Sequence, residues 1–240
     1  MEYMDRIAGV ELGGTKAIAL VTQAGRVGEK LVVPTTDPAQ TLGALRMALL
    51  DWHRHSPIAA LGIASFGPLR LDRAAADFGR MLATPKAGWS GADIAGQLAG
   101  PLNVPWRIDT DVNGAALAEW RWGAGQGCGS LCYLTIGTGV GGGIVIDGKI
   151  WNGHHGIAGE WGHNFLDESG GPCYCGKSGC VEKVISGPAL EKYYEELSGV
   201  KKRLREIVAL QQSDEAAKKT LDRLAHFFGK AVSVVTNILD

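Results

Sequence analysis

One short segment holds most of the residues that could bind a metal ion. His163 ends the run Gly-Glu-Trp-Gly-His, and Cys173, Cys175 and Cys180 lie in Cys-Tyr-Cys-Gly-Lys-Ser-Gly-Cys. One imidazole and three thiolates are the nitrogen and sulfur ligands of a closed tetrahedral zinc site. A disulfide between Cys173 and Cys175, separated by one residue, is geometrically awkward. The segment predicts a structural Zn²⁺ with no position for a reacting water; ordinary buried thiols are the alternative interpretation.

Composition excludes several classes of protein. The chain has 240 residues and a formal net charge of -1, and it lacks any basic run typical of nucleic-acid binding. No apolar stretch approaches the roughly 20 residues that cross a bilayer. Three of the five cysteines are assigned to metal, which is typical of a reducing compartment. We therefore expect a cytoplasmic protein that binds neither nucleic acid nor membranes.

Hydrophobic periodicity predicts an α/β fold. We expect strands over 7–12, 17–22, 29–34, 59–64, 106–109, 131–136 and 142–146. We expect helices over 39–52, 93–98 and 113–122, and a long helix from Asp214. The apolar faces of the first and last helices are predicted to be Leu42, Leu45, Met47 and Leu49, and Leu221, Leu224, Phe228, Val232, Val235 and Leu239. A smaller domain is expected over 1–110 and a larger one over 111–240.

Two glycine-rich loops lie between predicted strands. They contain Gly13, Gly14, Thr15 and Lys16, and Gly137, Thr138 and Gly139. Neither has the spacing of a Walker loop, which leads into a helix. A tight hairpin can instead present backbone N–H groups and a threonine hydroxyl to an anion. Each loop alone could be an ordinary β-turn, but the pair favours phosphates held from two sides.

Asp111 begins the run Asp-Val-Asn-Gly, where a predicted strand meets a predicted helix. One interpretation is a helix N-cap, since Asp and Asn are both favoured there. The chemical interpretation is a general base that accepts the proton of a hydroxyl attacking a terminal phosphate. Asp109 would face the same way on a continuous strand. We favour Asp111 because it begins the helix and is followed by Asn113.

The order of ELGGTK, TDVNGAALAE, IGTGVGGG, GEWGH and CYCGKSGCVE resembles the ROK family of sugar kinases, from about residue 7 to the end of the chain. The resemblance implies a two-domain actin/hexokinase-like fold, of the ribonuclease H-like ATPases. It also implies that Asp111 is the catalytic base. The residues implied to hold the sugar hydroxyls are Asn113, Glu160, His163 and Glu182, with His163 also binding zinc.

The same resemblance implies ATP and Mg²⁺ as cofactors and a homodimer as the assembly. The residues implied at the nucleotide are Glu11, Gly13, Gly14, Thr15, Lys16, Gly137, Thr138 and Gly139. Most family members have Asp where this chain has Glu11, so its contact with magnesium would be made through a longer arm.

The two parts of the chain resemble different branches of the family. Ser65-Phe66-Gly67-Pro68 and Thr84-Pro85-Lys86-Ala87-Gly88-Trp89 resemble bacterial fructokinases. From Gly153 onward the chain is more similar to manno(fructo)kinases, glucokinases and N-acetylglucosamine kinases. Residues 1–150 hold nine Arg and four Lys, whereas residues 151–240 hold three Arg and eight Lys. One hypothesis is a chimera joined near Trp151; chance drift of surface residues is the alternative.

We expect an ATP-dependent hexose kinase that phosphorylates the 6-hydroxyl, with fructokinase favoured over a glucokinase or a broader hexokinase. Family members continue beyond Asp240, so we expect a fold truncated at its C-terminus. A sugar-binding module without phosphoryl transfer is therefore an alternative. The family's transcription repressors carry a helix-turn-helix domain before the first phosphate loop. Here about six residues precede the first predicted strand, which leads into that loop, so DNA binding is not expected.

Overall fold

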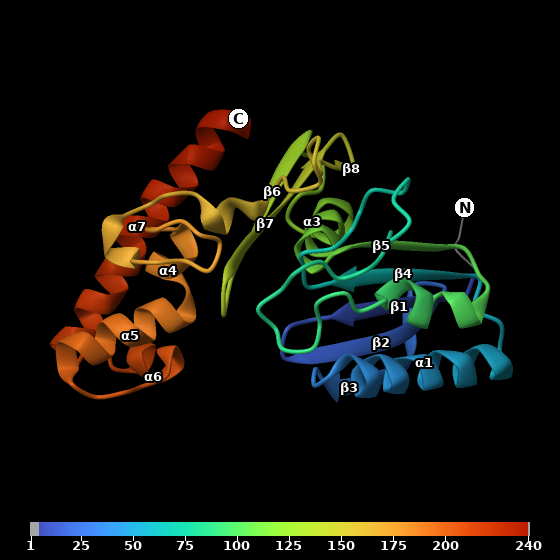
Figure 1. Cartoon of the computed structure of the whole chain (residues 1–240). Helices are drawn as coiled ribbons and strands as arrows, with labels where there is room; N and C mark the ends of the chain where they lie inside the picture. Colours follow the sequence, from blue (N-terminus) through green and yellow to red (C-terminus); the bar gives the residue numbers. More distant parts are fainter. Residues whose placement is uncertain (1–4, 240) are drawn as a thin grey trace. The chain divides into compact units, whose positions relative to one another are not determined.

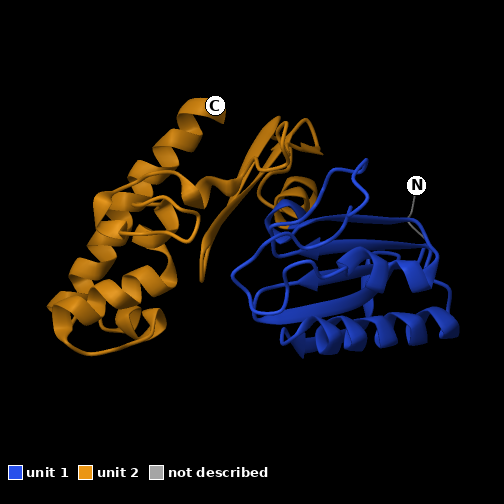
Figure 2. Cartoon of the chain, viewed as in Figure 1, with its two compact units in different colours: residues 1–114 blue, residues 115–240 orange. Residues whose placement is uncertain are grey.

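The chain forms two compact units. The computed structural model describes residues 5–239, and its units are Met1–Gly114 and Ala115–Asp240 (Figures 1 and 2). The sequence placed the domain boundary between residues 110 and 111, and its outer limits at residues 1 and 240 lie outside the described residues. Each unit contains its own sheet and its own hydrophobic core, as the α/β prediction requires.

The sheet of the first unit gathers several loops at one edge. Its strand order is β3-β2-β1-β4-β5, with β2 antiparallel to its neighbours and β4 and β5 parallel to β1. The strands are β1 (Ile7–Leu12), β2 (Lys16–Gln23), β3 (Arg26–Pro34), β4 (Ala60–Ser65) and β5 (Trp106–Thr110). Leu12 pairs with Ser65, and Ser65 pairs with Thr110. The segments after β1, β4 and β5 therefore leave the sheet side by side, where open α/β sheets bind ligands.

Helix α1 (Pro38–His55) packs against this sheet (Figure 1). Its start follows from Asp37, whose carboxylate accepts a hydrogen bond from the Gln40 N–H, and from Pro38 at the first helical position. Leu42, Leu45 and Leu49 are buried as predicted, but Met47 is 71% exposed, so its assignment to this face was wrong. Met47 lies about 200° around the helix from Leu45. The shorter α2 (Ile94–Leu98) and the 3₁₀ helix η1 (Gly100–Leu102) complete the first unit's helices within the described residues.

Helix α3 (Asp111–Trp122) begins directly after β5 and contains the boundary between the units. The sequence placed its start at Asn113. Close packing against β4 explains a glycine in its first turn, since a Cβ at Gly114 would lie 3.0 Å from the Cβ of Ala64. The strand thus runs into the helix without a loop, which fixes the residues at the junction.

The second unit combines an antiparallel sheet with a helical layer. The sheet order is β6-β7-β8, comprising β6 (Ser130–Ile136), β7 (Val140–Ile146) and β8 (Lys149–Ile150). The helices are η2 (Glu160–His163), η3 (Glu168–Gly170), α4 (Val181–Ile185), α5 (Gly187–Ser198), α6 (Leu204–Ala209) and α7 (Glu215–Leu239). Its main core joins β7, η2, α4 and α7 through Val140, Trp161, Val184 and Phe227.

The predicted stripe of α7 is confirmed in part, since Leu224 and Val235 pack half-buried against the core. Ala217, Thr220, Phe227 and Ala231 are buried, whereas Phe228 is 39% exposed. Small alanines allow close approach, and Thr220 can be buried because its hydroxyl donates to the carbonyl of Ala216 at 2.8 Å. Among residues 5–239, no helix has both the length and the apolar character needed to span a bilayer.

Candidate functional site

The first glycine loop connects β1 to β2 at the carboxyl edge of the parallel strands in the first sheet. Gly13 N–H donates to the carbonyl of Lys16 at 3.0 Å, and a Cβ at Gly13 would lie 2.9 Å from that oxygen. Thr35 donates through its hydroxyl to the carbonyl of Gly13 at 2.8 Å and through its N–H to that of Thr15 at 2.9 Å.

Two backbone N–H groups of the loop have no hydrogen-bond acceptor among the described residues, whereas a carbonyl of the same loop is engaged. The carbonyl of Gly14 accepts from Lys86 Nζ at 2.7 Å. Within residues 5–239 the N–H groups of Gly14 and Thr15 donate to no protein group, and a Cβ at Gly14 would meet no atom within 4 Å. A turn with engaged carbonyls and unengaged N–H groups can bind an anion.

Asp111 occupies the first position of α3. Its Oδ1 accepts a hydrogen bond from the Val112 N–H at 2.9 Å. The capping interaction is made instead by Thr110, whose hydroxyl accepts from the Asn113 N–H at 3.3 Å. The N-cap interpretation of Asp111 is therefore wrong, and its carboxylate is not needed to start the helix.

Burial sets the proton affinity of Asp111. Removal of the carboxylate from water raises the pKa of Asp111 above its ordinary value of 3.8, and the negative charge of Glu11 raises it further, against two backbone hydrogen bonds that lower it. A carboxylate with a raised pKa is a stronger proton acceptor. This arrangement suits a general base beside the first glycine loop.

Asp109 has a role that the sequence did not predict. Its Oδ1 accepts hydrogen bonds from the Asn113 side-chain amide at 2.6 Å and from the Thr110 N–H at 2.8 Å. Asn113 is only 3% exposed, so this contact fixes the direction of a buried amide. In the sequence, the one indication of this contact is that Asp109 and Asn113 are four residues apart across a strand-to-helix junction.

The four predicted metal ligands come together in the second unit. One nitrogen or sulfur atom from each of His163, Cys173, Cys175 and Cys180 lies within 4.8 Å of all the others. The Nδ1 of His163 is 3.6 Å from the Sγ of Cys173, and the sulfur atoms of Cys175 and Cys180 are 3.6 Å apart.

This donor set fits Zn²⁺. Tetrahedral Zn–S bonds of about 2.3 Å place sulfur atoms roughly 3.8 Å apart, close to the separations in the cluster. Burial raises the pKa of the Cys180 thiol to about 12, so that thiol keeps its proton at neutral pH unless a cation replaces it. Three thiols and one imidazole, without a carboxylate ligand, favour a structural zinc over magnesium or calcium.

Tyr174 and Glu182 surround the imidazole of His163. The hydroxyl of Tyr174 lies 3.1 Å from His163 Nε2, and the Glu182 carboxylate lies 3.9 Å from Nδ1 and 3.5 Å from Cys173 Sγ. Burial, then the negative charge of Glu182, raises the pKa of Tyr174 to about 12, so its hydroxyl remains protonated. With Nδ1 turned toward the thiols, Nε2 is the nitrogen directed at Tyr174.

The second glycine loop connects β6 to β7 and approaches the zinc cluster. Gly137 N–H donates to the carbonyl of Gly139 at 2.9 Å, and Gly187 at the start of α5 donates to the carbonyl of Gly137 at 2.8 Å. A Cβ at Gly139 would lie 3.0 Å from Glu182 Oε2. Since α4 begins directly after Cys180, the metal ligands position Glu182 against this loop.

The predicted site residues thus form two groups, one in each unit. In the first unit, the residues at the carboxyl edge of the sheet are Glu11, Gly13, Gly14, Thr15, Lys16, Asp111 and Asn113. In the second unit, Gly139, His163 and Glu182 meet through the contacts above. Glu160 opens η2 and adds negative charge near Tyr174, while Thr138 is an exposed residue of the second loop.

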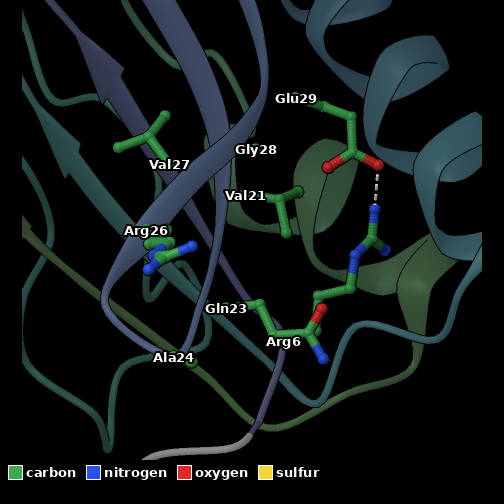
Figure 3. A pocket seen from close by; sticks show the side chains of 8 residues that line it. All are labelled: Arg6, Val21, Gln23, Ala24, Arg26, Val27, Gly28 and Glu29. Atoms are coloured by element: carbon green, nitrogen blue, oxygen red, sulfur yellow. Dashed lines mark hydrogen bonds and ion pairs between the residues drawn. The ribbon is translucent and has the colours of Figure 1, made fainter.

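A hollow elsewhere on the first unit is not a candidate for this site. It lies at the β2–β3 turn, at the opposite end of β1 from the glycine loop (Figure 3). Arg6, its most buried charged residue, is engaged by Glu29 and by the carbonyls of Trp52 and Ser56. The guanidinium is thereby used to join β1, β3 and the end of α1.

Comparison with known proteins identifies the family. The ROK family model matches residues 7–240. This chain belongs to the ROK family. It is 41% identical over 194 residues to a fructokinase from Zymomonas mobilis, covering 76% of this chain and 63% of that protein. It is 31% identical over 259 residues to a glucokinase from Halalkalibacterium halodurans, covering 97% of this chain and 76% of that protein.

Solved structures confirm the actin/hexokinase-like fold predicted from the sequence. The ROK hexokinase from Thermus thermophilus is 32% identical with a TM-score of 0.83, over 97% of this chain and 78% of that one. A ROK glucokinase from Streptomyces griseus, in complex with glucose and AMPPNP, is 28% identical with a TM-score of 0.80, over 98% of this chain and 80% of that one. The chain spans slightly less than two thirds of the Zymomonas fructokinase.

Proposed function

We propose that this chain transfers the terminal phosphoryl group of ATP to the 6-hydroxyl of a hexose, with fructose the favoured acceptor. The observation that carries the proposal is Asp111, a carboxylate of raised pKa held beside an anion-binding turn at the carboxyl edge of parallel strands. The family's relatives include proteins named fructokinase and glucokinase, so a glucokinase or a broader hexokinase is the alternative within this reaction.

In the proposed reaction Asp111 accepts the proton of the 6-hydroxyl. The hydroxyl oxygen forms a bond to the terminal phosphorus of ATP, and the bond between that phosphorus and the bridging oxygen breaks, so ADP leaves with the electron pair. Little further covalent chemistry is required, and the protein acts by alignment and by neutralising charge.

The backbone turns supply the donors for phosphate. The N–H groups of Gly14 and Thr15 are suited to phosphate oxygens on one side, and we assign Lys16 to the same loop. We also assign Gly137, Thr138 and Gly139 to the nucleotide. Mg²⁺, when bound, would supply positive charge to neutralise the phosphates, and the Glu11 carboxylate at the end of β1 would hold it.

The sugar is assigned to the side chains that the junction and the zinc cluster hold in place. Asn113 would bind a hydroxyl through an amide fixed by Asp109. We assign His163, Glu160 and Glu182 to other hydroxyls of the sugar. Zinc has a structural role here, because its ligands hold both His163 and the start of α4, which carries Glu182.

The test is a coupled assay that measures ADP release in the presence of ATP and Mg²⁺. Fructose, glucose, mannose and N-acetylglucosamine are supplied in parallel reactions. We expect turnover with fructose to be fastest and to fall by about 10²–10⁴-fold in Asp111→Asn. That variant keeps an oxygen able to accept from the Val112 N–H, so its fold is preserved. Asp222→Asn, on the exposed side of α7, is the matched control.

Faster turnover with glucose would favour the glucokinase assignment. Absence of turnover with every sugar, in a folded chain that still binds sugar, would favour the sugar-binding module. The homodimer implied by the family resemblance and the cytoplasmic location inferred from cysteine usage remain predictions. Sedimentation analysis of the purified chain tests the first of them.

A further inference from the structure

We propose that Lys86 belongs to the phosphoryl-transfer site, where its ammonium group binds the terminal phosphate of ATP. The inference rests on the proposed function and adds a residue to it. Lys86 Nζ donates to the carbonyl of Gly14 at 2.7 Å, although the two residues are separated by 72 positions in the sequence. The ammonium group is therefore held at the first glycine loop.

The contacts of Lys86 place its ammonium group near the ends of two neighbouring strands, β1 and β4. Lys86 lies in the segment between β4 and α2, and β4 is the strand between β1 and β5. The glycine loop follows β1, and Asp111 follows β5. Phe66 follows β4 directly, and its ring centroid is 5.8 Å from Lys86 Nζ, so the ammonium group lies beside the strand end between the loop and the base. We therefore assign Lys86 to the terminal phosphate, the group that moves from the loop toward the base.

The backbone that carries Lys86 is firmly anchored. Trp89 is completely buried, donates through Nε1 to the carbonyl of Thr36 at 2.8 Å, and packs edge-on against Phe66 with ring centroids 5.1 Å apart. The Trp89 N–H donates to the carbonyl of Lys86 at 3.2 Å, which closes the turn. Lys86 Nζ lies 5.8 Å from the Phe66 ring centroid, so the aromatic face also guides the side chain.

The charge of Lys86 is not neutralised by the protein. Within residues 5–239 it forms no ion pair, and its hydrogen bond to Gly14 uses one of three ammonium donors. The neighbouring N–H groups of Gly14 and Thr15 also donate to no described residue. A cation with spare donors next to unengaged amides forms a site for a polyanion such as a phosphate chain.

Calorimetric measurement of the affinities for AMPPNP and ADP distinguishes two roles of Lys86: direct contact with the terminal phosphate, and structural support of the glycine loop. The variants are Lys86→Gln, which keeps an N–H donor without charge, and Lys86→Met, which removes both. Lys30→Gln, on the exposed part of β3, is the matched control. We expect both Lys86 variants to bind AMPPNP about tenfold more weakly with little change in ADP affinity, and kcat to fall about 100-fold.

Three results would overturn the inference. Equal losses for ADP and AMPPNP would exclude the terminal phosphate as the contact. A Lys86→Gln variant that matches the wild type, beside a weakened Lys86→Met, would show that Lys86 only supports the loop. Lack of AMPPNP binding by the folded wild-type chain would remove the phosphate site altogether. Circular dichroism and thermal unfolding of each variant confirm that the fold is retained.

The same experiment distinguishes this inference from the proposed function. A wild-type chain that turns over no hexose contradicts the proposed function. A selective loss of AMPPNP affinity in the Lys86 variants, with ADP affinity unchanged, would still support the phosphate contact. Sugar-dependent turnover that is unchanged in both variants supports the proposed function and contradicts the role of Lys86.

Discussion

The Asp109 carboxylate accepts a hydrogen bond from the Asn113 side-chain amide at 2.6 Å, joining the end of β5 to the first turn of α3. The same carboxylate accepts from the Thr110 N–H, so one oxygen organises the strand-to-helix junction. Asp111, the proposed base, lies between these two residues. Its position is therefore fixed by neighbours that do not themselves need to react.

Replacing Asp109 by Ala should weaken sugar binding more than it slows chemistry. The buried amide of Asn113 would lose the acceptor that orients it, at a cost of about 1–3 kcal/mol in stability. We expect the KM for the sugar to rise roughly tenfold with a smaller change in kcat. Asp77→Ala, which removes an exposed ion pair with Arg70, is the control. A kcat loss as large as that of Asp111→Asn would instead make Asp109 a competing base.

The difference in stability between Asp111→Asn and the wild type should depend on pH. Because the folded pKa of Asp111 is raised, its protonated form is favoured by folding; that stabilisation is complete below the unfolded pKa and is lost as pH rises through the folded value. The asparagine variant imitates the protonated form. We expect it to be more stable than the wild type at pH 7 in urea unfolding, with the difference vanishing below pH 3.8. Equal stability at every pH would contradict the raised pKa.

Alanine at the two adjacent glycines should separate folding from nucleotide binding. In Gly13→Ala the new methyl would meet the Lys16 carbonyl at 2.9 Å, so we expect a loss of about 1–3 kcal/mol in stability. Gly14→Ala meets no protein atom within 4 Å, so its unfolding midpoint should be unchanged. Its methyl would occupy the approach of the phosphates, and AMPPNP affinity should fall roughly tenfold. Unchanged affinity would exclude Gly14 from the phosphate site.

Removal of one thiol should release the zinc. We expect the wild-type chain to contain one zinc ion by elemental analysis, and Cys180→Ser to contain little. Its unfolding midpoint should fall by more than about 5 °C, because metal binding stabilises only the folded chain. Cys128→Ser is the control, since Cys128 is exposed and outside the cluster. Equal zinc content in the two variants would contradict the assigned ligands.

Tyr174→Phe should weaken zinc binding without removing a ligand. With Nδ1 of His163 on the metal, the Nε2 proton donates to the Tyr174 hydroxyl, which lies 3.1 Å away. Loss of such an outer partner lowers metal affinity by roughly 10–100-fold, measurable by competition with a chromogenic chelator. Tyr133→Phe, in β6, provides the comparison. If zinc affinity stays at the wild-type value, Tyr174 does not orient the imidazole.

The sequence predicted those features that neighbouring residues determine, such as the first hairpin and the zinc cluster. The alternation in β1 and β2, with glycines between them, defines a hairpin whose strands match the expectation within a residue or two. The zinc cluster was predictable because cysteine spacing limits how the chain can place its thiols. Met47 was assigned to the buried face although the helical angle directs it away from Leu45, and Phe228 has the spacing of the stripe but is 39% exposed because the neighbouring Phe227 fills the core instead.

The contacts that complete the candidate site depend on tertiary structure. The bond between Lys86 and Gly14 arises because a turn after β4 reaches the loop after β1, which no spacing in the sequence indicates. The role of Asp109 depended on α3 beginning at Asp111, two residues before the expected start. Helix starts are the least certain part of a sequence prediction. Here the start decides that the Thr110 hydroxyl caps the helix, that Asp109 orients Asn113 and that Asp111 remains available for chemistry.

Phosphorus NMR of the reaction mixture tests the central claim most directly. The wild-type chain, incubated with ATP, Mg²⁺ and fructose, should convert the γ-phosphate signal into that of a hexose 6-phosphate ester, in amounts equal to the ADP formed. Asp111→Asn should form both products at least about 100-fold more slowly. Inorganic phosphate in place of the sugar ester, or ester formation at the wild-type rate in Asp111→Asn, would contradict the assignment of Asp111 as the base of a hexose kinase.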